Sequence, residues 1–425
     1  MHLYLFLLVI VSLSCGSLPV QDGTILEPAL ATTCMTLAWI LLCHVSARIC
    51  AVQVLREHID PLAAAKLMER QLDIFRWLGL GVVVLCLAGF GLARNLDNIP
   101  FLRDSSFLQA VILLMPGLAI TLGTWSAEHW YGVKVGYTNS KFQNFYRSLW
   151  QIFRSNVAWL VVPVLILLGL SDLISLMPVD EATSGMITVI MILLFVPLGL
   201  PWLVRHLFKT ERLDSGTERW VCELMTAVGL RRTRAVRWNT ASQSFNALVA
   251  GFVPPLRTLL MSDRLLDELP QEQVAMVVLH EAAHLRRKHV PLRMLSVLPA
   301  WGAGALLTQL AGDQSWAMVA GSGIGIIMTL LILRLVAYRT EYDADVQACR
   351  MAERIAAQLP GVPPTYDQAA DVLSAALMRV TFDQPESRRA TWLHPGVADR
   401  VNFMRRERTT ASENNTTAGT MANPA

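Results

Sequence analysis

The sequence has little charge of either sign, no cysteine motif and almost no net charge, and each absence excludes a class of protein. Asp, Glu, Lys and Arg make up 16% of the 425 residues, whereas an average soluble chain has about 25%. The seven cysteines are scattered without a CxxC pair, which excludes a disulfide framework and a cysteine zinc site. The net charge of +3 is too small for the basic face of a nucleic-acid-binding protein, so we predict no nucleic-acid partner.

The sequence is rich in long apolar runs instead. Hydrophobic residues make up 53% of the chain, and the mean hydropathy is +0.43. Most of the apolar segments reach the roughly 17 to 25 residues that a helix needs to cross a bilayer. They lie at 1–20, 29–51, 77–93, 107–125, 156–177, 186–204, 294–312 and 314–333. We therefore predict a mainly α-helical, polytopic membrane protein with about 7–8 transmembrane helices.

The placement of charge predicts how these segments are oriented. Segment 1–20 has no Lys or Arg between Met1 and Leu7, where a cleaved signal peptide carries them, so a membrane anchor is favoured. Loops 52–76 and 126–155 each hold four basic residues, and such loops stay on the cytoplasmic side. Three of the four alternate loops are poor in Lys and Arg. The alternation places residues 205–293 and the chain after about 334 in the cytoplasm.

Residues 205–293 are polar enough to form a water-soluble insertion. Hydrophobic spacing predicts helices at Glu218–Leu230 and Gln271–His289 and strands at Ala235–Trp238 and Thr258–Met261. A helix is also expected at Ala337–Leu359, and the lack of periodicity after residue 407 predicts a disordered tail. The predicted domains are N-terminal membrane helices at 1–207, a first soluble part at 208–293, a transmembrane hairpin at 294–333, a second soluble part at 334–407 and the tail at 408–425.

The motif that carries chemistry is His280-Glu281-Ala282-Ala283-His284 on a predicted helix. Residues four apart share one helix face, so His280 and His284 can bind the same Zn²⁺. Glu281 then lies beside the metal, where it can take a proton from the attacking water. We predict one zinc ion per chain, with Glu281 as the general base.

A catalytic zinc usually takes three protein ligands, and the later helix offers the third. Glu341 and Asp345 are four residues apart, so Glu341 can bind the metal while Asp345 accepts the free N–H of a ligand histidine. The predicted hairpin between the two motifs returns the chain to the side that it left. His289 lies nine residues after His280, off the ligand face, and is predicted to be a surface residue.

These motifs resemble those of the membrane-embedded zinc metallopeptidases that include HtpX-type proteases and CAAX prenyl proteases. That family combines HExxH, a helical hairpin and an ExxxAD-like motif, matched here by Glu341-Tyr342-Asp343-Ala344-Asp345. The resemblance covers roughly residues 205–405 and implies an α+β, zincin-like protease domain interrupted by the transmembrane hairpin.

Two weaker matches extend the resemblance. Asn246-Ala247-Leu248-Val249-Ala250-Gly251 is similar to the family's NAxxxG segment, which implies that Asn246 and Ala247 bind substrate where an extended peptide adds to a strand edge. His394-Pro395 with Arg400 is similar to its HPxxxxR pattern, which implies that His394 and Arg400 support the developing oxyanion. Gly396 departs from the family, where a second proline often follows.

The predicted function is that of a membrane-bound zinc endopeptidase acting on membrane-associated or misfolded proteins or peptides at the cytoplasmic face, in contact with membrane lipids. A BlaR-type signalling peptidase that cleaves a regulator, a CAAX-type C-terminal processing protease and a non-catalytic membrane scaffold or transporter remain as alternatives. An intramembrane site-two-type protease is disfavoured, because the motif helix continues into Arg286, Arg287 and Lys288 rather than into apolar residues. The sequence does not indicate an oligomeric state.

Overall fold

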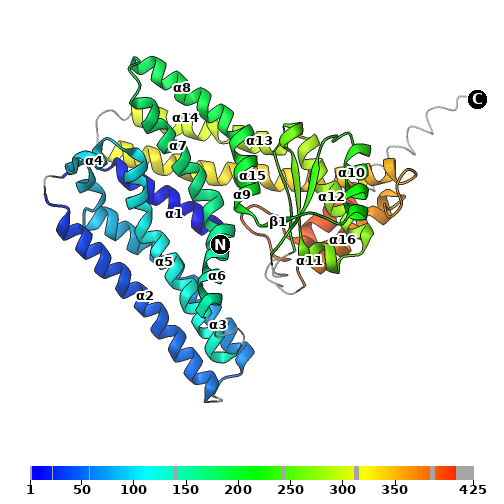
Figure 1. Cartoon of the computed structure of the whole chain (residues 1–425), viewed down its shortest axis with the longest axis horizontal. Coiled ribbons are helices and arrows are strands. Elements are labelled where there is room, and N and C mark those ends of the chain that lie inside the picture. Colours follow the sequence, from blue (N-terminus) through cyan, green and yellow to red (C-terminus); the bar gives the residue numbers. More distant parts are fainter. Residues whose placement is uncertain are drawn as a thin grey trace, which may run out of the picture. The chain divides into compact units, whose positions relative to one another are not determined.

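The computed structural model describes residues 2–21, 23–56, 58–136, 142–240, 245–251, 253–310, 315–382 and 388–407 (Figure 1). The chain forms two compact units, Met1–Val196 and Pro197–Ala425. The predicted disordered tail at 408–425 lies outside the described residues.

Seven helices in the described part of the chain are long and apolar enough to cross a membrane. They run over Leu26–Leu55, Ala63–Asn98, Ser106–Val135, Asn156–Ser175, Ala182–Leu207, His289–Leu310 and Gly323–Ile355, with a shorter apolar helix at Leu3–Ser17. Large apolar side chains point outward from them, such as Leu41 at 64% and Leu193 at 66% exposure. A protein in water would bury such residues, so the prediction of a helical, multi-pass integral membrane protein is confirmed.

The described residues of the first unit are helices and their connections. Helices α1 to α8 span His2–Ser14, Leu26–Leu55, Pro61–Val84, Pro100–Arg103, Ser106–Val135, Phe142–Ile152, Trp159–Ser175 and Glu181–Leu194. Short 3-10 or π turns extend several of them, at Cys15–Ser17, Leu85–Gly89, Ala93–Asn98 and Phe153–Ala158. Leu8, Leu87, Leu114 and Ile120 lie fully buried in the core between these helices.

The structure corrects the predicted loop at 52–76. Helix α3 begins at Pro61, so Arg76 lies inside a helix rather than in a loop. Its side chain is buried and pairs with Asp73 at 2.7 Å and with Glu128 of α5 at 3.1 Å. The count of basic residues in the predicted loop 52–76 therefore includes Arg76, although its charge is neutralised by acidic residues of α3 and α5.

The second unit contains a four-stranded sheet in the order β1-β2-β4-β3. The strands are β1 Thr210–Glu211, β2 Arg234–Trp238, β3 Ala247–Ala250 and β4 Thr258–Ser262. The pair β2 and β4 is parallel, with Val236 opposite Leu260, and the other two pairs are antiparallel. All five residues of β4 are buried, as expected for a central strand, and β3 forms one edge of the sheet.

Helices complete this unit. They are α9 Leu200–Leu207, α10 Ser215–Ala227, α11 Asp263–Glu268, α12 Gln271–Arg286, α13 His289–Ser296, α14 Leu298–Leu310, α15 Ser315–Ile355 and α16 Tyr366–Val380, followed by a helix at 397–407. Side-chain caps begin several of them, such as Asp214, which accepts from Thr217 N at 2.8 Å. Apolar residues of α10, α12, α15, α16 and β4 form one buried core, in which Leu224, Leu259 and Leu279 are fully enclosed.

Helix α15, the long yellow helix of Figure 1, joins an apolar hairpin to this core. Its 41 residues extend about 60 Å at 1.5 Å per residue, roughly twice the thickness of the hydrocarbon layer. The first half packs against α14 where Gly304 and Gly321 meet, and a Cβ on Gly304 would lie 2.9 Å from Gly321 O. The polar second half, which carries Glu341 and Asp345, is long enough to emerge from the bilayer.

Candidate metal centre

Helix α12 presents two histidines on one face. His280 and His284 are one turn apart, and their Nε2 atoms lie 3.2 Å from each other. The opposite face is anchored in the core, because Val278 and Leu279 are fully buried. The packing of this helix therefore fixes the positions of both imidazole rings.

Helix α15 brings a carboxylate to the same place. The side chain of Glu341 is buried, and its oxygens lie 3.7 Å from His280 Nε2 and 3.5 Å from His284 Nε2. One ligand atom from each of the three residues lies within 4.8 Å of the other two. The structure thus assembles the three predicted metal ligands from two helices separated by a hairpin.

This donor set fits zinc. Two imidazole nitrogens and one carboxylate oxygen are an established ligand set of catalytic zinc. With Zn–N distances of about 2.0–2.1 Å, adjacent ligand atoms of a tetrahedral site are roughly 3.3 Å apart. The 3.2 Å between the two histidine nitrogens is close to that spacing, as are the 3.5 Å from His284 Nε2 to Glu341 Oε1 and the 3.7 Å from His280 Nε2 to Glu341 Oε2.

Comparison with known proteins identifies the domain that holds this site. Residues 211–408 match peptidase family M48. This segment is an M48 zinc metallopeptidase domain. The crystal structure of S. mikatae Ste24p has a similar fold, with 14% sequence identity, a TM-score of 0.51, and coverage of 88% of this chain and 98% of that one. A search of curated proteins found no match. The predicted family and the predicted enzyme class are confirmed.

In the M48 domain, a buried carboxylate supports His280 from behind. Asp345 Oδ1 lies 2.9 Å from His280 Nδ1, and Asp345 is fully buried. Arg400, from the helix at 397–407, donates to both oxygens of Asp345 at 2.7 and 2.6 Å. Asp345 therefore lies beside His280, and its predicted role as the support of this ligand stays a prediction. Arg400 holds Asp345, and its predicted role at the oxyanion stays a prediction.

The two ligand histidines have different electrostatic surroundings. Burial by itself lowers the pKa of His280, but the hydrogen bond and charge of Asp345 outweigh it, so the pKa lies above the ordinary 6.5. Burial, with the nearby charge of His280, lowers the pKa of His284 to about 2. His284 is thus neutral, the form in which histidine binds a metal.

The structure corrects the prediction for His289. The residue is 3% exposed, and its Nδ1 lies 2.9 Å from His284 Nδ1 while its Nε2 lies 3.0 Å from Asp343 Oδ2. Helix α12 ends at Arg286, and Lys288 takes a positive φ of 55° before α13 begins. This turn brings His289 back toward the metal ligands, whereas a continuous helix would have pointed it away.

Glu281 of the M48 domain is held next to the ligand group. Burial raises its pKa to about 7, and the nearby charge of Glu341 adds to this effect while that of His280 opposes it. The backbone N–H of Val249 in β3 donates a hydrogen bond to its carboxylate. Glu281 is thus a carboxylate whose pKa is near neutral, which suits proton transfer.

Two more side chains, His394 and Arg293, contact the carboxylate of Glu341. His394 Nδ1 lies 3.3 Å from Glu341 Oε2, with a side chain that is 58% exposed. Arg293 of α13 donates to Glu341 Oε1 at 3.0 Å and to Thr340 Oγ1 at 2.6 Å. The sequence predicted His394 by resemblance but gave no signal for Arg293, which carries no motif and follows a turn that was predicted as helix.

The predicted substrate residues lie at the start of the edge strand. Ser262 and Asn246 exchange two hydrogen bonds, and β3 begins at Ala247 with the pairing Ala247 to Met261. Strand β3 lies beside α12, and its Val249 contacts Glu281. The structure thus has Asn246 just before the strand that adjoins α12 and Ala247 at its first position, while their contact with substrate stays a prediction.

Proposed function

We propose that this protein is a membrane-bound zinc endopeptidase that hydrolyses peptide bonds of membrane-associated or misfolded proteins or peptides at the cytoplasmic membrane face. The observation that supports this most directly is the convergence of His280, His284 and Glu341 with Glu281 beside them. All three ligand residues are present, and a neighbouring side chain contacts each of them. This argues against a non-catalytic scaffold.

The mechanism follows from the positions of these groups. A zinc ion held by the three ligands would polarise the scissile carbonyl and make water acidic. Glu281 accepts the proton of the attacking water and then donates it to the leaving amine, because its pKa of about 7 allows both steps. To His394, which is partly exposed and 3.3 Å from Glu341, we assign the hydrogen bond to the oxyanion.

Strand β3 provides the proposed binding edge for the peptide. In the described sheet, β3 is an edge strand that pairs only with β4. An edge strand offers its free backbone groups to an extended peptide. Val249 links this strand to Glu281, so a peptide added at β3 would bring a carbonyl close to the general base. Asn246 and Ala247 would contact the substrate at the beginning of the strand.

The proposal also assigns a role to each part of the chain. We assign membrane anchoring to residues 1–207 and to the hairpin at 294–333, and peptide hydrolysis to 208–293 and 334–407. The cytoplasmic orientation rests on the basic loops between the apolar segments.

Metal content tests the proposed function most directly. Full-length protein purified in detergent should contain one zinc per chain, and His280→Ala and Glu341→Ala should each lose it. Cleavage of casein by the wild type should stop when a chelator removes the metal. Glu272→Ala is the matched control, because Glu272 lies exposed in the first turn of the same helix. A wild type without zinc would contradict the proposal.

A further inference from the structure

A chain of three side chains, of which His289 is buried, leads from the metal ligand His284 toward the surface. His289 Nδ1 lies 2.9 Å from His284 Nδ1, and His289 Nε2 lies 3.0 Å from Asp343 Oδ2. His289 is 3% exposed. Arg287 Nε donates to the same Asp343 oxygen at 2.9 Å.

The hydrogen positions along this chain follow from the role of His284. If His284 Nε2 gives its lone pair to a metal, its proton must be on Nδ1. His289 Nδ1 must then accept that proton's hydrogen bond, so the proton of His289 is on Nε2 and is donated to Asp343. Each N–H in the chain then meets one acceptor, and each of the two contacts made by His289 has one proton between its two atoms.

The other ligand histidine, His280, also has a polar partner at its Nδ1. His280 also faces the metal site with Nε2, and its Nδ1 lies 2.9 Å from Asp345. The two ligands thus have separate supports, a carboxylate for His280 and a histidine backed by a carboxylate for His284. The second support comes from α13 and from the far side of α15.

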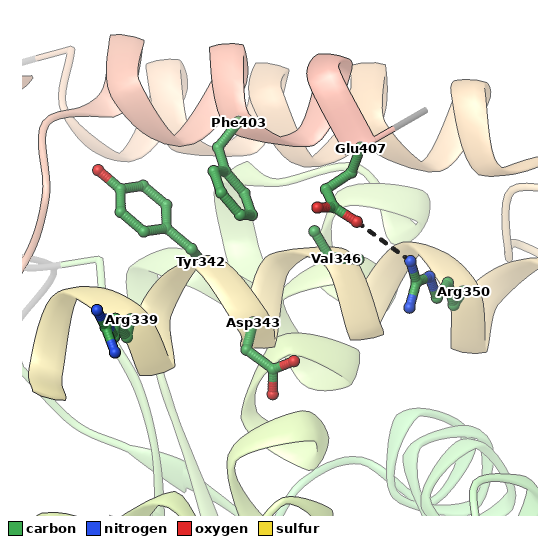
Figure 2. Close-up of a pocket in the computed structure, with 7 residues that line it drawn as sticks. All are labelled: Arg339, Tyr342, Asp343, Val346, Arg350, Phe403 and Glu407. Carbon is green, nitrogen blue, oxygen red and sulfur yellow. Dashed lines mark hydrogen bonds and ion pairs between the residues drawn. The ribbon is translucent and has the colours of Figure 1, made fainter. Parts of the chain in front are cut away.

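The placement of Asp343 makes it available for this role. Figure 2 shows Asp343 projecting from α15 on the side away from Tyr342 and Phe403, whose stacked rings have centroids 4.7 Å apart. Its side chain is 30% exposed, and Arg287 on one side and His289 on the other hold its carboxylate.

We propose that His289 is a positioning residue for the metal: it accepts the Nδ1 proton of His284, with Asp343 behind it, and so holds the His284 Nε2 lone pair toward the ion. The inference rests on the proposed function in one respect, that His280, His284 and Glu341 bind zinc. Such supports of ligand histidines typically change metal affinity 10- to 100-fold when they are removed.

The test measures metal release rather than activity. Full-length zinc-loaded protein in detergent is mixed with an excess of a chromogenic chelator, and the zinc release rate is followed by absorbance. We expect His289→Leu to release zinc about 10- to 100-fold faster, Asp343→Ala to release it faster by a smaller factor, and His289→Asn, whose amide oxygen replaces Nδ1 as acceptor, to stay near the wild-type rate. His206→Leu is the matched control, since His206 lies in α9 against Trp202.

A spectrum distinguishes positioning from general loosening of the fold. With Co²⁺ in place of zinc, His289→Leu should shift the visible ligand-field bands, whereas His289→Asn and His206→Leu should keep the wild-type bands. Unchanged release and unchanged bands in a folded His289→Leu, or equally fast release from His289→Asn, would overturn the inference. A wild type that binds zinc but does not cleave casein would overturn the proposed function instead, so the two failures are separable.

Discussion

At the scale of single residues, Glu281 has the clearest predicted role. Replacing it with Gln removes the carboxylate that accepts the proton but leaves the three metal ligands in place. We therefore expect Glu281→Gln to retain zinc and to lower kcat by about 10²- to 10⁴-fold, the usual contribution of a general base. Metal analysis and casein cleavage on the same sample measure both quantities. Rapid cleavage by the zinc-loaded variant would exclude Glu281 as the base, and Glu272→Gln on the same helix is the control.

The raised pKa of His280 predicts how metal binding depends on pH. In the metal-free protein the proton on His280 is stabilised by Asp345, and zinc must displace it. Because the folded pKa lies above 6.5, zinc affinity should be full at higher pH and fall by up to about tenfold per unit as the pH drops below that pKa.

Zinc titrations at several pH values, with a competing chelator, measure this dependence. Asp345→Asn removes the charge that raises the pKa of His280, so it should move the midpoint of the dependence to lower pH. A pH-independent affinity between pH 5 and pH 8 would contradict the assignment of His280 as a ligand supported by Asp345.

The residues of the site were not equally predictable from the sequence. His280 and His284 follow from the helical repeat alone, because a spacing of four fixes their common face. His289 could not be placed, because its position depends on the left-handed Lys288, and such a conformation is normally signalled by Gly or Asn. Arg293 follows the same turn, so its contact with Glu341 could not be predicted from the sequence either.

At the scale of elements, the glycines of the hairpin make a matched pair of predictions. A Cβ on Gly304 would lie 2.9 Å from the backbone oxygen of Gly321, whereas a Cβ on Gly302 would meet nothing within 4 Å. Both residues are in α14. Gly304→Ala should therefore force α14 and α15 apart and cost about 1–3 kcal/mol, while Gly302→Ala should be tolerated, since small residues allow close helix packing only where helices meet.

Thermal unfolding of the detergent-purified protein distinguishes the two variants. The melting temperature of Gly304→Ala should fall clearly below that of the wild type, and that of Gly302→Ala should stay close to it. Equal melting temperatures for both variants would mean that the close approach at Gly304 does not stabilise the hairpin.

Element boundaries were predictable where a local signal exists. The strands at Ala235–Trp238 and Thr258–Met261 were found, since β-branched and aliphatic residues repeat there, and the observed strands differ from them by one residue each. The short β1 was not predicted, because two residues carry no periodicity. The order of the sheet, in which β4 lies between β2 and β3, depends on tertiary packing that no local pattern encodes.

At the scale of the whole molecule, apolar length predicted the membrane segments well and the loops poorly. Seven of the eight hydrophobic runs correspond to helices of membrane length in the described residues, and the run 1–20 corresponds to the shorter apolar helix Leu3–Ser17. The bilayer imposes a minimum length that can be counted from the sequence. Loop charges are a weaker guide, since a basic residue such as Arg76 is buried in a helix and paired with Glu128. The sidedness of the protein therefore needs its own measurement.

The last prediction concerns the side of the membrane on which the M48 domain works. In a variant without its native cysteines, Glu272→Cys places one thiol on the exposed first turn of α12. Val179→Cys places one in the connection 176–180 between α7 and α8, at a position that is 40% exposed. The basic residues of segments 52–76 and 126–155 predict that these connections are cytoplasmic, and with that orientation the alternation of spans puts Glu272 inside and Val179 outside. A membrane-impermeant maleimide should therefore label Cys at 179 in intact cells and Cys at 272 only after permeabilisation. Because a peptidase reaches only substrates on its own side, the reverse pattern would move the proposed substrates to the outer face while leaving the zinc chemistry unchanged.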